Sequence, residues 1–242
     1  MTDSGGERRR GGGGNRRTRV HDPRGRSRGP KVRVRTARGR KPSSTRWLER
    51  QLNDPYVAEA NRLGYRARSA FKLLELDEKF DLLSGARRAV DLGCAPGSWL
   101  QILVHRLPKD AEIVGIDLLE VDPVPGAVIL KQDFLDESAE AALKAHLTGK
   151  VDLVLSDMAA DTIGHKQTDH LRTMALCEAA LDFADAHLAP GGHFVAKVLQ
   201  GGAEGDLLRR MKAAFKSVKH AKPPASRPES VEWYVIARDY RG

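Results

Sequence analysis

The stretch RAVDLGCAPGSWLQIL, from Arg88 to Leu103, decides the fold. It begins with an apolar-rich segment, passes through a turn that contains Gly93 and Gly97, and ends in an apolar pattern with helical spacing. A strand, a tight loop and a helix in this order form a unit that holds a nucleotide at the carboxyl end of the strand. The stretch therefore predicts an α/β domain with a nucleotide-like ligand at this loop.

The spacing of the glycines separates two kinds of nucleotide-binding loop. A dinucleotide site requires Gly-x-Gly-x-x-Gly, but Ala95 stands two residues after Gly93. An acid followed by Gly-x-x-x-Gly is instead typical of methyltransferases that use S-adenosylmethionine (SAM). Glycine permits the tight turn and lets the backbone approach the ligand. The loop thus favours SAM over a nicotinamide cofactor, and we interpret Asp91 as a residue that supports the loop.

Strand and helix patterns alternate after this stretch, which predicts a mostly parallel sheet covered on both faces. Because the segment between the last two strands holds no helix and is too short for a parallel crossover, those strands should be antiparallel. The expected fold is α/β and Rossmann-like, with seven strands, of which the last is antiparallel. Strands are expected at 88–93, 112–117, 127–131, 151–156, 192–198, 216–220 and 231–237, and helices at 97–106, 136–147, 168–188 and 204–215.

The charge of the chain is concentrated at its N-terminus. Residues 1–46 contain 16 Lys and Arg against 3 Asp and Glu, whereas the whole chain has 41 against 32. Residues 47–242 therefore form a mildly acidic domain. The 1–46 segment is rich in Arg and Gly and poor in apolar residues, so we expect a disordered tail that contacts RNA phosphates. A tail that only improves solubility is the alternative.

Composition indicates the kind of cellular compartment in which the protein is expected. No apolar run is long enough to cross a bilayer, and the N-terminus lacks the apolar core of a secretory signal. The two cysteines, Cys94 and Cys177, form no metal-ligand pattern and suit a reducing compartment. We therefore expect a cytoplasmic protein without a metal. An organelle transit peptide is the less favoured alternative, because the Arg-rich start has no apolar face.

Acidic residues follow three of the predicted strands. Asp117 ends the second strand, where a carboxylate accepts hydrogen bonds from ribose hydroxyls. Asp133 follows the third strand and is placed to meet an adenine amino group, and Asp157 follows the fourth. Each acid alone is explained equally well as a helix N-cap. Three of them beside a glycine loop favour a SAM site.

A lysine inside an apolar strand is the second chemical signal. Lys197 lies in the fifth strand, and lysine is almost never fully buried without a partner. Asp157 on the adjacent strand supplies one, and Glu232 joins them if the last strand is antiparallel. Lys72, in the helix before the first strand, cannot be placed from sequence alone. A lysine that extends to solvent at the end of the sheet is the alternative.

Over about residues 45–237, the chain resembles the FtsJ-type heat-shock methyltransferases (the RlmE family). The matching segments recur in order: SSTRWLERQLNDPYV, RARSAFKL, VDLGCAPGSW, DLLEVDP, LSDMA, LAPGGHFVAKVLQG, KPPASRPES and EWYVIA. The resemblance implies SAM-dependent 2′-O-methylation of a uridine ribose in the A-loop of 23S ribosomal RNA, late in assembly of the large subunit. It also implies a cytoplasmic enzyme, which we expect to be a monomer without a membrane segment.

The same resemblance assigns roles to residues. It places a catalytic tetrad on Lys72, Asp157, Lys197 and Glu232, and SAM contacts on Gly97, Trp99, Asp117, Asp133 and Asp157. Two positions depart from the family pattern: Ser98 replaces the second glycine of Pro-Gly-Gly-Trp, and SDMAAD replaces SDMAPN after the fourth strand. The long basic tail is an addition to the family's compact form.

Methyl transfer to a ribose hydroxyl suggests a mechanism that the structure can test. Lys197 is the candidate general base, which requires burial or a neighbouring cation such as Lys72 to lower its pKa. Two groups of cations are candidate RNA surfaces: Arg62, Arg66, Arg68 and Lys72, and Arg209, Arg210, Lys212, Lys216, Lys219 and Lys222. Rival functions are a ribose methyltransferase acting on tRNA or another RNA, a non-catalytic RNA-binding assembly factor, and a nicotinamide dehydrogenase.

Overall fold

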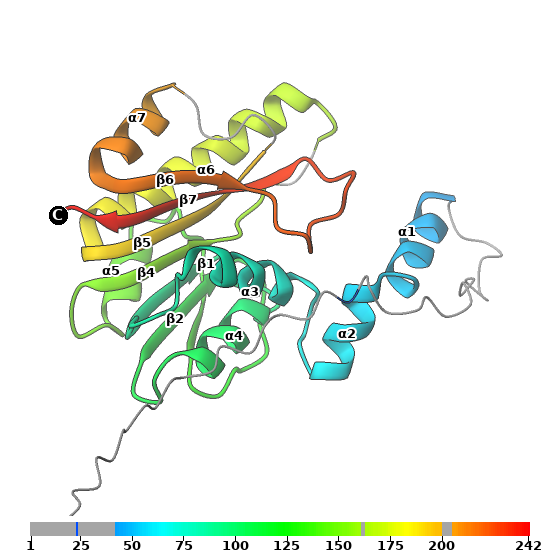
Figure 1. The fold of residues 1–242 in the computed structure, drawn as a ribbon, viewed down its shortest axis with the longest axis horizontal. Helices are drawn as coiled ribbons and strands as arrows, with labels where there is room; N and C mark the ends of the chain where they lie inside the picture. The colour runs from blue at the N-terminus through cyan, green and yellow to red at the C-terminus, as the bar shows by residue number, and fades with distance from the viewer. Residues whose placement is uncertain (1–22, 24–41, 161–162, 200–204) are drawn as a thin grey trace, which may run out of the picture.

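A seven-stranded sheet forms the centre of the computed structural model, which describes residues 23, 42–160, 163–199 and 205–242. The strand order is β3-β2-β1-β4-β5-β7-β6 (Figure 1). The strands are β1 (Arg88–Leu92), β2 (Glu112–Asp117), β3 (Val128–Lys131), β4 (Val151–Ser156), β5 (Leu188–Leu199), β6 (Phe215–Ala221) and β7 (Glu232–Tyr240). The helices are α1 (Pro42–Leu52), α2 (Pro55–Leu63), α3 (Ser69–Phe80), α4 (Ser98–Arg106), α5 (Ala139–Lys144), α6 (Lys166–His187) and α7 (Gly205–Ala214).

The direction of the strands confirms the predicted topology. Strands β1 to β5 are paired in parallel, and β7 is antiparallel to both of its neighbours, β5 and β6. The connection between β6 and β7 spans only residues 222–231, so a parallel return was excluded by length. Because β7 runs backwards, its first residue lies beside the carboxyl ends of β4 and β5.

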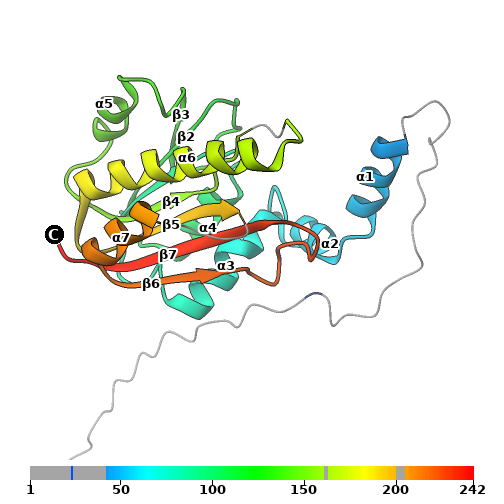
Figure 2. The same ribbon diagram turned by 90° about the horizontal axis from the view of Figure 1, so that it is seen from above.

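Helices cover both faces of the sheet, as Figure 2 shows. Helices α3 and α4 lie on one face, and α5, α6 and α7 lie on the other. Alternate residues of a strand supply the two apolar cores: Leu153 and Leu155 pack under α3 and α4, whereas Val154 packs under α6. This double burial explains why the central strands are nearly continuous apolar runs.

The same alternation decides which polar strand residues face α3. Val195 and Ile236 belong to the core under α3 and α4. Lys197 lies two residues after Val195, and Tyr234 two residues before Ile236, so both side chains point to that face. Polar residues near the carboxyl end of β5 and the amino end of β7 are thereby turned toward the helix that carries Lys72.

The N-terminal boundary differs from the one predicted. Helix α1 begins at Pro42, so 42–46 belong to a helix rather than to the tail. The rest of the predicted tail, apart from residue 23, lies outside the described residues. The predicted helix 136–147 is shorter, covering Ala139–Lys144. No helix in the described ranges has the length and apolar character needed to cross a membrane.

Candidate active site

Sheet register brings the predicted site residues to one edge. Ser156 of β4 is paired with Ala196 of β5, so the residues that follow them, Asp157 and Lys197, are neighbours. The backbone N–H of Asp157 donates to the carbonyl of Leu92 and ties it to the end of β1, where the glycine loop begins. Glu232 opens β7 opposite Leu199. The structure thus explains why residues far apart in sequence converge here.

An alternating chain of charges joins the four residues of the predicted tetrad. Lys197 Nζ lies 2.9 Å from Asp157 Oδ1 and 3.5 Å from Glu232 Oε1, and it donates to the Asp157 carbonyl at 2.8 Å. Lys72 Nζ donates to Glu232 Oε2 at 3.2 Å. Only 7% of Lys197 is exposed, so it is a buried cation between two carboxylates. This geometry favours a paired lysine over one that extends to solvent.

Tyr234 is a member of this cluster that sequence reasoning missed. Its phenol is buried, donates to Asp157 Oδ1 at 2.6 Å and accepts from Lys72 Nζ at 3.2 Å. Burial, with the charge of Asp157, raises the pKa of Tyr234 well above its usual value, so the phenol stays protonated as a donor. The signal was its position two residues after Glu232, which puts both on one face of β7.

The expectation that the pKa of Lys197 is lowered is wrong for this arrangement. Burial lowers the pKa of Lys197, but Asp157 and Glu232 outweigh burial and hold it above its ordinary value. Burial likewise raises the pKa of Asp157, but Lys197 and then Lys72 bring it below its usual value. The expectation relied on burial and on Lys72, and it gave too little weight to the two carboxylates, of which Glu232 Oε1 lies 3.5 Å from Lys197 Nζ.

A cavity of about 410 Å³, the Asp117 cavity, opens on one side of Asp157. Asp117 accepts from the backbone N–H of Ala95 at 2.8 Å and of Leu119 at 2.8 Å. Asp133 Oδ1 accepts from the backbone N–H of Leu135 at 2.9 Å. Each acid therefore accepts from the N–H two residues later in a local turn, and both also face the cavity. Neither is a helix N-cap, the alternative interpretation, since Ser138 holds that position before α5. It is lined by Gly93, Ala95, Ile116, Asp117, Leu118, Leu119, Gln132, Asp133, Phe134, Leu135, Asp157, Met158, Ala159 and Leu176.

Gly97 and Trp99, predicted to contact the cofactor, are not among the residues that line this cavity. The Trp99 indole is buried, donates to the carbonyl of Ser69 at 2.9 Å and packs on Tyr234. Gly97 has φ +98° and precedes α4 without a side-chain cap. The first N–H groups of a helix have no partner within the helix. Backbone N–H groups of this turn, rather than the indole, are what this segment offers a ligand.

The departure at Ser98 is accommodated. Ser98 is the first residue of α4, so its backbone is helical and needs no glycine. Its side chain is buried, and its hydroxyl lies 2.6 Å from the hydroxyl of Ser69.

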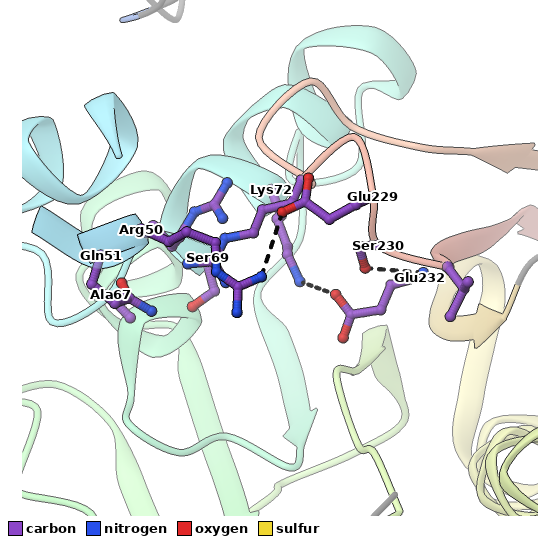
Figure 3. A pocket seen from close by; sticks show the side chains of 11 residues that line it. Arg50, Gln51, Ala67, Ser69, Lys72, Glu229, Ser230 and Glu232 are labelled. Atoms are coloured by element: carbon purple, nitrogen blue, oxygen red, sulfur yellow. Dashed lines mark hydrogen bonds and ion pairs between the residues drawn. The ribbon is translucent and has the colours of Figure 1, made fainter. Parts of the chain in front are cut away.

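A second cavity, of about 540 Å³, lies on the other side of the charge cluster, and we call it the Lys72 cavity. Figure 3 shows Lys72 and Glu232 reaching toward each other at this cavity, with Arg50 and Glu229 at another part of it. The two cavities are therefore separated by the chain of contacts from Asp157 through Lys197 and Glu232 to Lys72. The second is lined by Arg50, Gln51, Ala67, Arg68, Ser69, Lys72, Arg227, Glu229, Ser230, Val231 and Glu232.

The first predicted RNA surface is not a free basic face. Arg62 pairs with Glu59 at 2.6 Å, and Arg68 pairs with Asp54 at 3.0 Å. The Arg66 guanidinium donates to backbone carbonyls. These cations already have acceptors within the protein, and the shared RNA-binding face stays a prediction. Helical spacing revealed the row of cations but not the acceptors of Arg66 and Arg68 on other elements.

In the second predicted RNA surface, some cations have partners within the protein and others are exposed. Arg210 contacts Asp182 at 2.7 Å and Asp185 at 3.0 Å, and Arg209 pairs with Asp206. Lys222 donates to two carbonyls of its own loop. Exposed cations remain at Lys212, Lys216 and Lys219.

Asp91 is buried under the site, and neither of its carboxylate oxygens has a hydrogen-bond partner among the described residues. The expected support of the glycine loop by this side chain is therefore not observed. Burial, then the charges of Asp157 and Asp117, raise the pKa of Asp91 well above its usual value. Burial therefore favours the protonated form of the Asp91 carboxyl in the folded protein.

Asp91→Asn is expected to gain stability relative to wild type as pH rises. The carboxyl of an unfolded Asp ionises near about pH 4, whereas burial holds the pKa of Asp91 above that value in the folded protein. The folded wild type therefore has its full stability below the unfolded pKa and loses stability as pH rises toward the folded pKa. The Asn variant has no such loss. Melting temperatures of both proteins between pH 4 and 7 provide the measurement. A difference independent of pH would mean that Asp91 is ionised in the folded state.

Two cavities, separated by a Lys-Asp-Lys-Glu cluster, lie at the carboxyl edge of a Rossmann-like sheet, an arrangement that suits transfer of a group between two ligands. The model of the FtsJ-like methyltransferase family matches residues 65–240. "Ribosomal RNA large subunit methyltransferase E" of Erythrobacter litoralis is 61% identical over 88% of this chain and 96% of its own length. The same-named protein of Rhodospirillum rubrum is 57% identical over 98% of this chain and 92% of its own length.

Solved structures agree with the sequence relatives. A protein from Plasmodium falciparum, assigned as a ribosomal RNA methyltransferase, has a crystal structure that matches with a TM-score of 0.64 and 32% identity, covering 74% of this chain and 100% of that one. The chain belongs to the FtsJ-like methyltransferase family and is an enzyme. A nicotinamide dehydrogenase and a protein outside the enzyme class are thereby excluded. The R. rubrum match extends into the basic segment, so that segment is not peculiar to this chain.

Proposed function

We propose that this methyltransferase transfers a methyl group from SAM to the 2′-oxygen of a uridine ribose in the A-loop of 23S ribosomal RNA. The observation that carries the proposal is the position of the tetrad between two cavities. Asp157 lines the Asp117 cavity, whereas Lys72 and Glu232 line the Lys72 cavity. A donor in the first and an acceptor in the second would meet at Lys197.

The Asp117 cavity fits SAM in the chemistry of its donor set. Asp117 would accept from the ribose hydroxyls, and Asp133 from the adenine amino group. The N-terminus of α4, at Ser98 and Trp99, would suit the carboxylate of the methionine portion, whereas the N–H of Gly97 already donates to the carbonyl of Cys94 at 2.6 Å. When bound, SAM supplies an electrophilic methyl group on a sulfonium. The residues of this chain orient that methyl group toward Lys197.

In this mechanism, Lys197 acts as a catalytic residue on the acceptor. A neutral Lys197 would take the proton of the 2′-hydroxyl while the ribose oxygen forms its bond to the methyl carbon. The sulfur keeps the electrons of the broken S–CH₃ bond. Asp157, which accepts from Tyr234, holds Lys197 from the donor side. Glu232, which pairs with Lys72, holds it from the acceptor side.

The acceptor cavity suits a single nucleotide of a longer RNA. Its rim carries Arg50 and Arg227, whose side chains are 53% and 25% exposed and lie within reach of flanking phosphates. The basic segment 1–46 precedes and overlaps α1, which carries Arg50, and would add sequence-independent attraction to RNA. We further propose 23S ribosomal RNA in the late large subunit as the partner, and the names of the relatives support an RNA of the large subunit. We also propose a cytoplasmic location and a monomeric enzyme.

Transfer of labelled methyl groups from SAM to three RNA preparations tests the substrate. Large ribosomal subunits from cells that lack this enzyme, free ribosomal RNA and tRNA would be compared at equal nucleotide concentration. We expect transfer to the large subunit, and a preference over free ribosomal RNA if assembly is required. Transfer only to tRNA would keep the chemistry and overturn the substrate. Binding of the subunit without any transfer would favour an assembly role.

A further inference from the structure

Arg66 lies between the two segments that wall the Asp117 cavity. Its Nη1 donates to the carbonyl of Pro96 at 3.0 Å and to that of Asp122 at 2.6 Å. Its Nη2 donates to the carbonyl of Pro123 at 2.8 Å. One guanidinium thus joins the glycine loop to the segment that follows β2. Hydrogen bonds from a charged donor are about twice as strong as neutral ones.

Both segments contribute to the cavity wall close to these contacts. Ala95 of the glycine loop lines the cavity and donates to Asp117. Leu118 and Leu119 line it from the other segment and are 65% and 67% exposed, so packing alone does not hold them. Backbone N–H groups of Gly93, Cys94 and Ala95 tie the start of the glycine loop to the end of β2. Arg66 adds a tie at the far end of the loop, from Pro96 to the carbonyls of residues 122 and 123.

The same contact leaves no room for a side chain at Gly97. A Cβ at Gly97 would lie 2.6 Å from Arg66 Nη1, and its φ of +98° disfavours any other residue. The Arg66 backbone is fixed in turn, because its N–H donates to Gln101 of α4 at 2.9 Å. Arg66 is therefore held from both ends against the loop.

We propose that Arg66 is a positioning residue for the methyl donor: it fixes the glycine loop against the 118–123 segment in the shape that binds the donor, and it does not contact RNA. This inference rests on the proposed function for the identity of the donor. Among the described residues, no carboxylate pairs with Arg66, so its positive charge also remains near the N-terminus of α4. Arginine suits the position because its planar fork serves several acceptors at once, which lysine does not.

Arg66→Ala tests the proposal through separate constants for donor and acceptor. We expect the dissociation constant for SAM to rise about tenfold or more, since each charge-assisted hydrogen bond is worth about that factor. The KM for RNA should stay within about twofold, because no phosphate contact is lost. Arg66→Lys should recover part of the SAM affinity. Arg106→Ala, at the exposed far end of α4, is the matched control and should change neither constant.

Other results would overturn the proposal. A higher KM for RNA with unchanged SAM affinity would make Arg66 an RNA contact, and equal losses in both constants would make it a general structural residue. A wild-type protein that binds no SAM would contradict the proposed function and this inference with it. Melting temperatures provide a test without cofactor: Gly97→Ala should destabilise the Arg66→Ala background less than the wild type, and equal effects would contradict the contact.

Discussion

Lys197→Ala is expected to lower the rate of methyl transfer by about a thousandfold while leaving SAM binding within about threefold of wild type, because a positioned acid–base group contributes on that scale. Lys197 is the group that contacts both carboxylates of the site, through Asp157 and Glu232. Its removal takes away the base and the centre of the charge cluster. Single-turnover transfer to RNA and calorimetric SAM binding provide the two measurements.

The charge state of Lys197 predicts how the rate of methyl transfer depends on pH. Asp157 and Glu232 hold its pKa above the ordinary value, so only a small neutral fraction exists at neutral pH, and this fraction grows about tenfold per pH unit below the pKa. The rate should therefore rise with pH across pH 7–9. Glu232→Gln removes one of the two carboxylates and should shift the profile to lower pH. A flat profile would assign Lys197 the role of a cation that holds the ribose oxygen.

Controls separate chemistry from folding in this experiment. Lys197→Met keeps most of the side-chain volume and should be as inactive as Lys197→Ala. Lys109→Ala, on an exposed turn at the opposite end of the sheet, should retain wild-type activity. Near-normal turnover of either Lys197 variant would remove this residue from the chemical step.

Gly93→Ala is expected to destabilise the fold by more than about 3 kcal/mol and to abolish SAM binding, since left-handed backbone strain and overpacking each cost about 1–3 kcal/mol. Gly93 has φ +77°, and a Cβ there would lie 2.7 Å from Met158 Cγ and 2.9 Å from Met158 N. Met158 follows Asp157 and lines the same cavity. Relief of the clash would displace the backbone that holds the tetrad.

Gly85→Ala is the matched control for this prediction. Gly85 has a similar φ of +80°, but nothing lies within 4 Å of its Cβ position. It should lose only the strain of the backbone, about 1–2 kcal/mol. Chemical denaturation and SAM titration of both variants provide the comparison. Equal losses of stability would show that the contact with Met158 does not matter.

The architecture was predictable because its signals are local. Apolar runs between turn residues predicted each strand, and the short connection before β7 predicted its direction. Register along adjacent parallel strands then predicted that Asp157 and Lys197 are neighbours. These inferences need only the period of a strand and the length of a connection.

Partners across the fold were not predictable. Arg62 pairs with Glu59 on its own helix, which spacing could have shown. The acceptors of Arg66 and Arg68 are carbonyls from two later loops and Asp54, which the basic stretch gives no sign of. The pKa of Lys197 was misjudged for the same reason, because it depends on the summed distances to Asp157 and Glu232. Sequence predicted that Lys72, Asp157, Lys197 and Glu232 lie together, which the structure shows, but not how their charges balance.

As proposed, the enzyme methylates the 2′-oxygen of a uridine in the large-subunit RNA. The most direct measurement is nuclease digestion of large subunits methylated in vitro, followed by mass spectrometry of the labelled nucleoside and mapping of its position. The account predicts a single 2′-O-methyluridine in 23S ribosomal RNA that disappears with Lys197→Ala. A label on a base, or on several unrelated riboses, would contradict it.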